Sequence, residues 1–377
     1  IMPPRLWRIV TSGMRPLCVI KRIKTMSQVK VIHGQIRLII IFFTLLISAC
    51  NGQEQTNKSR IELSKVIANT QELIIGNTQS KEQISQVVRK IFQDSKGDIW
   101  FGTEGGAFRL SNNSLVYIDS IKSKSGKRVT IKDIVEDKDG TIWLGHTDGI
   151  SSINGETVIN YYESDGLISN DVWCIEADTN GNVWIGTIEG ACKFNGQEFN
   201  NFKMPEGKID STLGISSKKM VHNITEDSKG SIWLSTNAGL FSYVEGNLIH
   251  VSEMVGIETN FVNEIFEDTS GEIWVSTKQG LYKLQGNKSI NITGDKIEIG
   301  KGIGSIAEDK DGKIWFVSNQ HYLYTFDGNE LIEFQKSEDN KGPVVFQIYK
   351  DQDDRLWFVG FGGAFRLENG KFLNITK

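Results

Sequence analysis

Aspartate residues recur in this sequence at a spacing that calcium loops also use. The sequence Asp-x-x-Gly occurs six times in register, and residues 137–140 and 309–312 each carry a second aspartate. Calcium, however, takes roughly six to eight oxygen ligands, and the full EF-hand spacing is absent. Asp at the first position and Gly at the fourth is also the preference of a type I turn. We therefore interpret these sequences as turns and expect no metal and no other cofactor.

Histidine is the other residue type with catalytic potential. Four histidines lie beyond residue 50, namely His146, His222, His250 and His321. No Ser-His-Asp order, HExxH, glycine-rich phosphate loop or CxxC accompanies them. The residue types by themselves predict no catalytic residue, so the function depends on the elements that position the side chains.

A repeat of about 42 residues organises the chain. Seven tryptophans stand 43, 41, 49, 41, 41 and 42 residues apart. Isoleucine always lies nine positions before the tryptophan, and aspartate always lies six positions before it. Glycine lies three positions before and six positions after the tryptophan in six copies each, and Asp354 and His321 are the exceptions. The aligned tryptophans are Trp100, Trp143, Trp184, Trp233, Trp274, Trp315 and Trp357.

Each repeat predicts four short strands. The isoleucine lies in the first strand, and the Asp-x-x-Gly turn leads to an apolar run such as residues 99–103, typical of a strand covered on both faces. The later glycine begins a third strand, and a polar turn precedes a fourth. Four strands per repeat are the signature of a propeller blade. We predict an all-β, seven-bladed β-propeller of four-stranded antiparallel blades over residues 86–377, with the tryptophans between adjacent blades.

Residues 1–49 have the composition of a secretory signal. They contain eight Lys and Arg and no Asp or Glu, and their apolar run at 38–47 is too short for a bilayer core of about 30 Å. A start at Met26 would give a conventional signal length and leave residues 1–25 untranslated. The Ile-Ser-Ala-Cys sequence ending at Cys50 resembles a bacterial lipobox; the alternative is an ordinary signal peptide. We expect residues 50–85 to tether the propeller to a membrane through a lipid on Cys50.

Charge and cysteine content limit the partners and the cross-links. The whole chain has a net charge of −4, and residues 50–377 alone have −12, which disfavours a nucleic-acid partner. Cys174 and Cys192 are expected on the first and third strands of one blade. Two strand spacings separate them by roughly 9.6 Å, beyond the reach of a disulfide. We predict two free thiols.

The repeat resembles that of two-component regulator propellers, the extracytoplasmic sensor parts of bacterial hybrid histidine kinases. The resemblance is carried by EDKDGTIWLGHTDGI (136–150), EDSKGSIWLSTNAGL (226–240) and EDTSGEIWVSTKQGL (267–281), and extends to all seven repeats. Val317 and Val359 depart from the Gly or Ser found at their position elsewhere. The resemblance implies sensing in the bacterial cell envelope, facing the periplasm or the cell exterior. The 377 residues hold no kinase motif or output domain, so kinase activity is not expected.

The loops between the second and third strands are the candidate binding sites, because loops carry function on rigid scaffolds. We expect them to open on the same face as the connections between blades, and their residue types vary between repeats. Residues 201–217 add about eight residues to one repeat and form either a flap over the central opening or an idle loop. The candidate ligand-binding residues are Glu104, His146, Asp148, Glu189, Asn237, Lys278, Gln279, Asn319, His321 and Phe361.

Three functions stay open at this point. The first is a non-catalytic propeller lipoprotein that binds a small ligand, a glycan or an envelope protein in a sensory system. The second rests on a similarity to streptogramin lyases, seven-bladed propellers that use His and Glu with Mg²⁺; a comparable set here would be His146, His321 and Glu189. The third is a structural or assembly lipoprotein.

Overall fold

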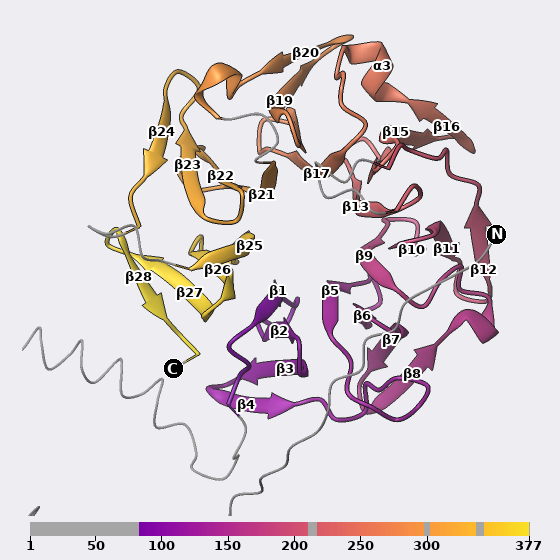
Figure 1. Ribbon diagram of the computed structural model, residues 1–377. Helices are drawn as coiled ribbons and strands as arrows, with labels where there is room; N and C mark the ends of the chain where they lie inside the picture. The colour runs from indigo at the N-terminus through magenta and orange to yellow at the C-terminus, as the bar shows by residue number, and fades with distance from the viewer. Residues whose placement is uncertain (1–82, 210–216, 298–301, 337–342, 377) are drawn as a thin grey trace, which may run out of the picture. The chain divides into compact units, whose positions relative to one another are not determined.

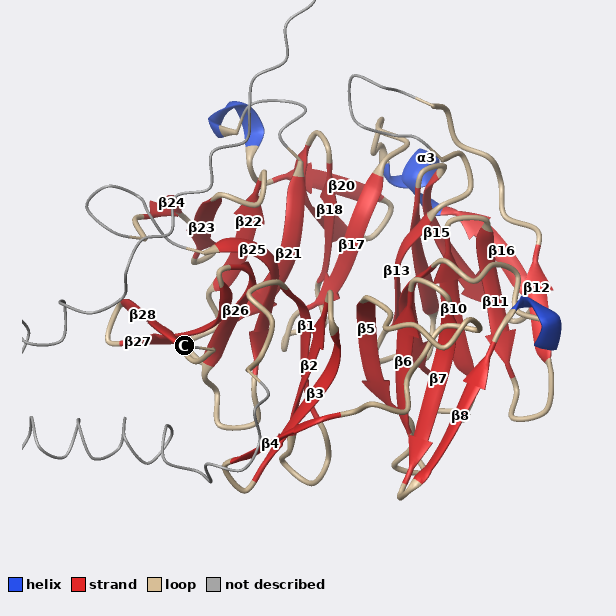
Figure 2. Cartoon of the chain, turned by 60° about the horizontal axis from the view of Figure 1, so that its bottom comes forward, coloured by secondary structure: helices blue, strands red, loops and turns tan. Residues whose placement is uncertain are grey.

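Seven four-stranded antiparallel sheets form a ring, which confirms the predicted β-propeller (Figure 1). The computed structural model describes residues 83–209, 217–297, 302–336 and 343–376. Each blade is one continuous segment of chain whose strands follow one another from the centre of the ring outward. The blades are numbered 1 to 7 from the N-terminus, and Figure 2 shows their strands from the side.

The strands occupy corresponding positions in all seven blades. The inner strands are β1 (Val88–Gln93), β5 (Ile131–Glu136), β9 (Val172–Ala177), β13 (Val221–Glu226), β17 (Val262–Glu267), β21 (Ile303–Glu308) and β25 (Val344–Lys350). The second strands are β2 (Ile99–Thr103), β6 (Ile142–His146), β10 (Val183–Thr187), β14 (Ile232–Thr236), β18 (Ile273–Thr277), β22 (Ile314–Ser318) and β26 (Leu356–Phe361). The third strands are β3 (Gly106–Ser111), β7 (Gly149–Asn154), β11 (Gly190–Phe194), β15 (Gly239–Val244), β19 (Gly280–Gln285), β23 (Tyr322–Phe326) and β27 (Gly363–Glu368).

The outer strands and three short helical turns complete the described elements. The outer strands are β4 (Ser114–Tyr117), β8 (Thr157–Tyr161), β12 (Phe199–Phe202), β16 (Asn247–His250), β20 (Lys288–Asn291), β24 (Leu331–Phe334) and β28 (Lys371–Asn374). The helical turns are η1 (Glu163–Asp165), α3 (Val251–Val255) and η3 (Gly294–Lys296). No helix in the described part of the chain is long and apolar enough to cross a membrane.

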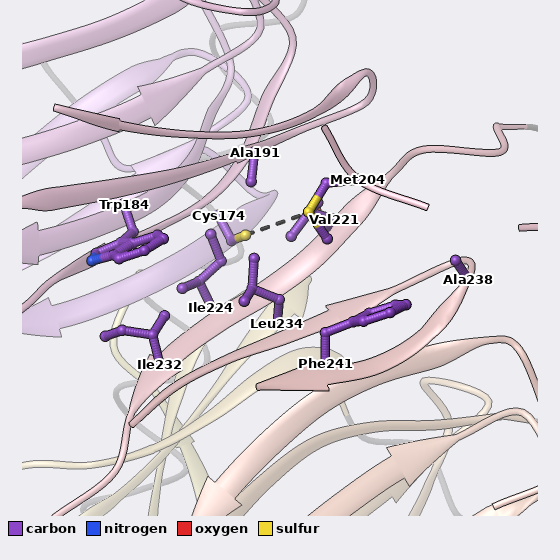
Figure 3. Packing of buried hydrophobic residues seen from close by; sticks show 10 residues of the cluster. All are labelled: Cys174, Trp184, Ala191, Met204, Val221, Ile224, Ile232, Leu234, Ala238 and Phe241. Carbon is purple, nitrogen blue, oxygen red and sulfur yellow. Dashed lines mark hydrogen bonds between the residues drawn. The ribbon is translucent and has the colours of Figure 1, made fainter. Parts of the chain in front are cut away.

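The repeat tryptophans pack against the next blade, as predicted. Trp184 of blade 3 lies in one buried cluster with Ile224 and Ile232 of blade 4 (Figure 3). Equivalent clusters join the other neighbouring blades. A single blade cannot bury its own faces, so burial of this large aromatic surface between blades stabilises the ring.

The repeat aspartates do more than form turns. In blade 1, Asp94 accepts hydrogen bonds from the backbone N–H groups of Lys96 and Asp98 at 3.0 and 2.9 Å, and its second oxygen accepts the indole N–H of Trp100 at 2.8 Å. The indole bond recurs in all seven blades at 2.7–2.8 Å. The aspartate therefore fixes the turn and the tryptophan orientation together.

A glutamate that precedes the aspartate links four pairs of blades. Glu136 of blade 2 accepts bonds from the backbone N–H and the hydroxyl of Ser95 in blade 1, at 2.6 and 2.8 Å. The same paired bonds join Thr179 to Glu226, Ser228 to Glu267, and Thr269 to Glu308. The Glu-Asp pair in the repeat thus joins neighbouring blades as well as closing a turn.

The ring closes by direct contact between blades 7 and 1. Gln347 accepts the backbone N–H of Ile91 at 2.8 Å, and the hydroxyl of Tyr349 accepts that of Gln93 at 3.0 Å. Trp357 packs in a cluster with Val88 and Ile91. Closure therefore uses the same interface as the other blade pairs, without exchange of a strand between the two ends (Figure 1).

Cys174 on β9 and Cys192 on β11 are buried and free, which confirms the two predicted thiols. Burial raises the pKa of the Cys192 thiol to about 11 and that of Cys174 well above its usual value. The expected signal segment, Cys50 and its tether lie outside the described residues, as do residues 210–216 of the long insertion. The described residues 203–209 of that insertion form no strand.

Candidate functional site

The loops between second and third strands share one end of the propeller with the connections between blades. Their backbones are hydrogen-bonded to each other: Thr147 N–H donates to the Thr130 carbonyl at 3.1 Å, and Ile188 N–H donates to that of Asp171 at 3.2 Å. The expected loop face therefore exists, and it surrounds one end of the inner strands.

A β-bulge interrupts all seven inner strands next to this face. In β1 the pairing with β2 shifts between Val88 and Lys90, and corresponding shifts occur in the other inner strands. Bulges re-aim a side chain. The bulged position carries a side chain in six blades and Gly304 in blade 6. We call these six the channel mouth: Arg89, Lys132, Trp173, His222, Asn263 and Phe346.

The channel mouth lines a cavity of about 170 Å³ that is formed by residues from all seven inner strands. The next position along each strand completes its wall. We call these seven residues the channel ring: Lys90, Asp133, Cys174, Asn223, Glu264, Ser305 and Gln347.

Arg89 of the channel mouth connects blades 1 and 7. Its guanidinium donates to Glu104 at 2.7 Å and lies over the ring of Phe346, 5.3 Å from its centroid. Phe346 in turn packs edge-on against Phe361, which is 48 % exposed. An aromatic surface with a cation beside it is therefore accessible on this side of the mouth.

Lys132 and Trp173 form a second group between blades 2 and 3. The Lys132 ammonium lies 3.6 Å from the centroid of the Trp173 ring and is paired with Asp171. The Trp173 indole N–H donates to the same carboxylate at 3.3 Å. Burial lowers the pKa of Lys132, although the Asp171 carboxylate opposes this shift. Trp173 is outside the repeat series, and here it belongs to the mouth.

His222 forms a third group between blades 4 and 5. Its ring is within 2.7 Å of the Asn237 side-chain oxygen and packs against Phe261 at 4.5 Å between centroids. Lys278 lies over the same Phe261 ring, 4.8 Å from its centroid. Burial lowers the pKa of His222 to about 4, so its imidazole is neutral near pH 7. Two predicted residues, Asn237 and Lys278, thus meet the mouth through this group.

The channel ring connects each blade to the next. Asp133 accepts the N–H of Ile175 at 3.0 Å, Asn223 that of Ile265 at 3.1 Å, and Ser305 that of Ile348 at 3.2 Å. The Lys90 side chain cannot accept a hydrogen bond, and it forms an ion pair with Asp133 of the next blade at 2.7 Å instead. The polar inner surface is therefore a structural network as well as a channel lining.

The structure places the ten predicted binding residues in different surroundings. Glu104, Asn237, Lys278 and Phe361 contact channel-mouth residues or their immediate neighbours. The others have local partners or face outward: Asp148 accepts the N–H of Lys124 at 2.9 Å, Glu189 lies 3.9 Å from Lys219, Gln279 N–H donates to Thr277, and Asn319 and His321 are exposed.

His146 is enclosed within its own hairpin. It is fully buried, one ring nitrogen lies 3.0 Å from the Ser151 hydroxyl, and the other accepts the N–H of Asp148 at 3.2 Å. Thr103 of blade 1 accepts the corresponding N–H of Gly105 at 3.1 Å. His146 therefore takes the place of a turn-stabilising threonine. Burial lowers its pKa to about 4.

The described residues contain no group of three or more His, Cys, Asp and Glu suited to a metal ion. The set of His146, His321 and Glu189 is spread over blades 2, 6 and 3, and His146 has both ring nitrogens engaged locally. These positions do not form the converging ligand set that the lyase hypothesis needs.

Sequence reasoning missed the bulged residues because their position lies inside a predicted strand. A signal was nevertheless present. Between an apolar residue and the constant isoleucine, this position carries Arg, Lys, Trp, His, Asn, Gly or Phe in the seven repeats. Such variety within a constant frame indicates a position that the scaffold does not specify.

Comparison with family models identifies three of the repeats. Residues 82–105, 123–148 and 166–189 match the model described as Two component regulator propeller. These stretches lie in blades 1, 2 and 3. Comparison with curated proteins finds no match.

Several solved structures share the fold. The extracellular domain of BT3049 from B. thetaiotaomicron, assigned to a hybrid two-component system, is 22% identical with a TM-score of 0.59, and the match covers 77% of this chain and 40% of that one. The extracellular domain of BT4673 from the same organism, also assigned to a hybrid two-component system, is 19% identical with a TM-score of 0.59, and the match covers 76% of this chain and 38% of that one. Virginiamycin B lyase from Staphylococcus aureus is 12% identical with a TM-score of 0.57, and the match covers 74% of this chain and 93% of that one.

The chain spans about two fifths of the length of the two sensor domains. At these identities, the likeness to solved structures establishes the fold. The repeats provide the more specific finding, since the family model matches them by sequence. The chain thus carries two-component regulator propeller repeats on a seven-bladed β-propeller.

Proposed function

We propose that this protein is a non-catalytic, sensor-type propeller that binds a small ligand or glycan at the channel mouth. The observation that carries this proposal is the composition of the mouth. Aromatic side chains from three inner strands line one cavity together with Arg89, Lys132 and Asn263. Ligand sites characteristically combine apolar and aromatic walls with a few placed polar groups.

A glycan suits this arrangement chemically. A sugar ring has an apolar C–H face that packs on an aromatic ring, and its hydroxyls both donate and accept hydrogen bonds. Trp173 and Phe346 offer such rings. A cation lies over each ring and places hydrogen-bond donors beside it. Both cations are paired with carboxylates, so the mouth offers donors and acceptors together rather than one strong charge.

The location and the signalling connection are part of the same proposal. A basic and apolar leader that ends at Cys50 supports export and lipid attachment of the mature protein to a bacterial envelope membrane. The two-component regulator propeller repeats support a sensory role. Substitution of Cys50 by Ser should abolish incorporation of labelled palmitate and release the protein from membranes, and unchanged labelling would contradict the anchor.

The binding test uses the full chain, a panel of oligosaccharides, and calorimetry after a thermal-shift screen. Binding raises the melting temperature because it stabilises only the folded state. Trp173→Ala should weaken a saturable hit by about tenfold or more, equivalent to about 1.4 kcal/mol. The matched control is Ile159→Ala, which removes an apolar side chain that is 46 % exposed on the outer strand β8.

The outcomes separate the alternatives. Equal weakening by Trp173→Ala and Ile159→Ala, or none by either, would overturn the mouth as the binding site. Turnover of a ligand would favour a lyase. A folded protein that binds no oligosaccharide but co-purifies with one envelope protein would favour an assembly role.

A further inference from the structure

A larger cavity lies at the other end of the inner strands. It has a volume of about 410 Å³ and is bounded by β17, β21 and β25 of blades 5, 6 and 7, together with the turn that follows β17. We call it the lower cavity. It begins at the channel ring with Glu264 and Gln347, and it extends away from the loop face toward the turns between inner and second strands.

The walls of the lower cavity combine two aromatic rings with one small residue. Phe266 and Tyr349 occupy corresponding positions on blades 5 and 7, and Ala307 occupies that position on blade 6 between them. The short alanine side chain leaves room at this position of the blade between them. Aromatic faces attract cations through their quadrupole, by roughly 0.5–2 kcal/mol each.

Four carboxylates line the cavity, but three of them are already engaged at both oxygens. Glu267 accepts the N–H and hydroxyl of Ser228. Glu308 accepts the N–H and hydroxyl of Thr269 in the same way. Asp268 accepts the backbone N–H groups of Ser270 and Glu272 and the indole N–H of Trp274. Lys350 is the single cation among the lining residues, and it lies 3.9 Å from Asp354.

Glu264 is the remaining carboxylate. Its hydrogen-bond partners are the Ile306 N–H and the Ser305 hydroxyl, both neutral, and burial raises its pKa to about 7. Lys90 opposes the rise in the Glu264 pKa through its charge, but it is paired with Asp133 at 2.7 Å, and among the described residues no Lys or Arg forms an ion pair with Glu264. A partly buried carboxylate that no cation pairs with directly is costly, and a bound cation would compensate it.

We propose that the lower cavity is a second binding site, which takes a small organic cation. The ammonium group of the ligand binds Glu264, and its apolar body lies between Phe266 and Tyr349. A cavity of this volume accommodates a single-ring or short-chain amine. This site differs from the channel mouth in position, in charge and in ligand class.

The experiment uses the full chain and benzylammonium chloride, with benzyl alcohol as the neutral probe of equal shape. Calorimetry should show saturable binding of benzylammonium, about tenfold or more tighter than that of benzyl alcohol. Glu264→Gln keeps an oxygen to accept the Ile306 N–H but removes the charge. In this variant the two probes should bind with equal affinity.

Two controls fix the location of the site. Glu176→Gln removes another inner-strand carboxyl that does not line the lower cavity, and Trp173→Ala alters the channel mouth; both should leave benzylammonium affinity within about twofold of the original value. The unliganded melting temperature of each variant checks its fold. Equal binding of the two probes by the original protein, undiminished binding by folded Glu264→Gln, or no saturable binding would overturn the proposal.

Discussion

Glu176 provides a quantitative test of the electrostatics inside the ring. It lies on the inner strand β9, accepts the Glu226 N–H at 3.2 Å, and has no ion-pair partner among the described residues. Burial raises its pKa to about 8 from the ordinary 4.5. The folded protein therefore holds this proton over a pH range in which the unfolded chain has released it.

The sign of the effect follows from this difference in proton binding. Because the folded pKa is the higher one, the stability contribution of Glu176 is fully present below about pH 4.5 and is lost as the pH rises to about 8. At 1.36 kcal/mol per pKa unit, the whole shift corresponds to at most about 5 kcal/mol. Since the side chain is only partly buried, we expect about 2–4 kcal/mol.

Glu176→Gln tests this because the amide oxygen can still accept the Glu226 N–H. Urea unfolding followed by tryptophan fluorescence would be measured at several pH values between 4.5 and 8 for both proteins. The variant should match the original protein near pH 4.5 and exceed its stability increasingly as the pH rises. Glu198→Gln, at an exposed glutamate, is the control and should leave the pH dependence unchanged. A stability difference that stays constant across this range would refute the reasoning.

Two further substitutions test the repeat and the buried histidine. Asp94→Ala removes the acceptor of three N–H donors, including the buried Trp100 indole, and should lower the free energy of unfolding by about 3–5 kcal/mol, measured against exposed Asp139→Ala. Burial depresses the pKa of His146, so the stability of the original protein should fall as the pH drops from about 6.5 to about 4. The His146→Thr variant should not show this fall. Acid unfolding curves that coincide for His146→Thr and the original protein would contradict that assignment.

The blades were predictable from the sequence because their determinants are local. Asp94, Gly97 and Trp100 lie within seven residues of one another, and turn preference and apolar runs act over that distance. Recurrence of the pattern seven times then set the number of blades. Even the free state of Cys174 and Cys192 followed from strand order alone.

The candidate sites, in contrast, needed the tertiary structure. The mouth and the lower cavity are built from inner strands about 42 residues apart in sequence; each strand contributes one or two residues to the mouth cavity and three or four to the lower cavity. Only closure of the ring brings Arg89 of blade 1 beside Phe346 of blade 7. The bulge that re-aims these side chains depends on pairing with a second strand, so strand periodicity could not reveal it.

The burial of individual polar side chains was also decided by tertiary packing. His146 and Asn237 are polar residues that the sequence placed in exposed loops, yet both are buried. Glu264 and Glu176 have the same side chain as the surface glutamates, but the neighbouring blades shield them partly from water and raise their pKa. Sequence determined the repeating scaffold through local preferences, whereas the chemistry of the channel arose from distant repeats that meet only around the closed ring.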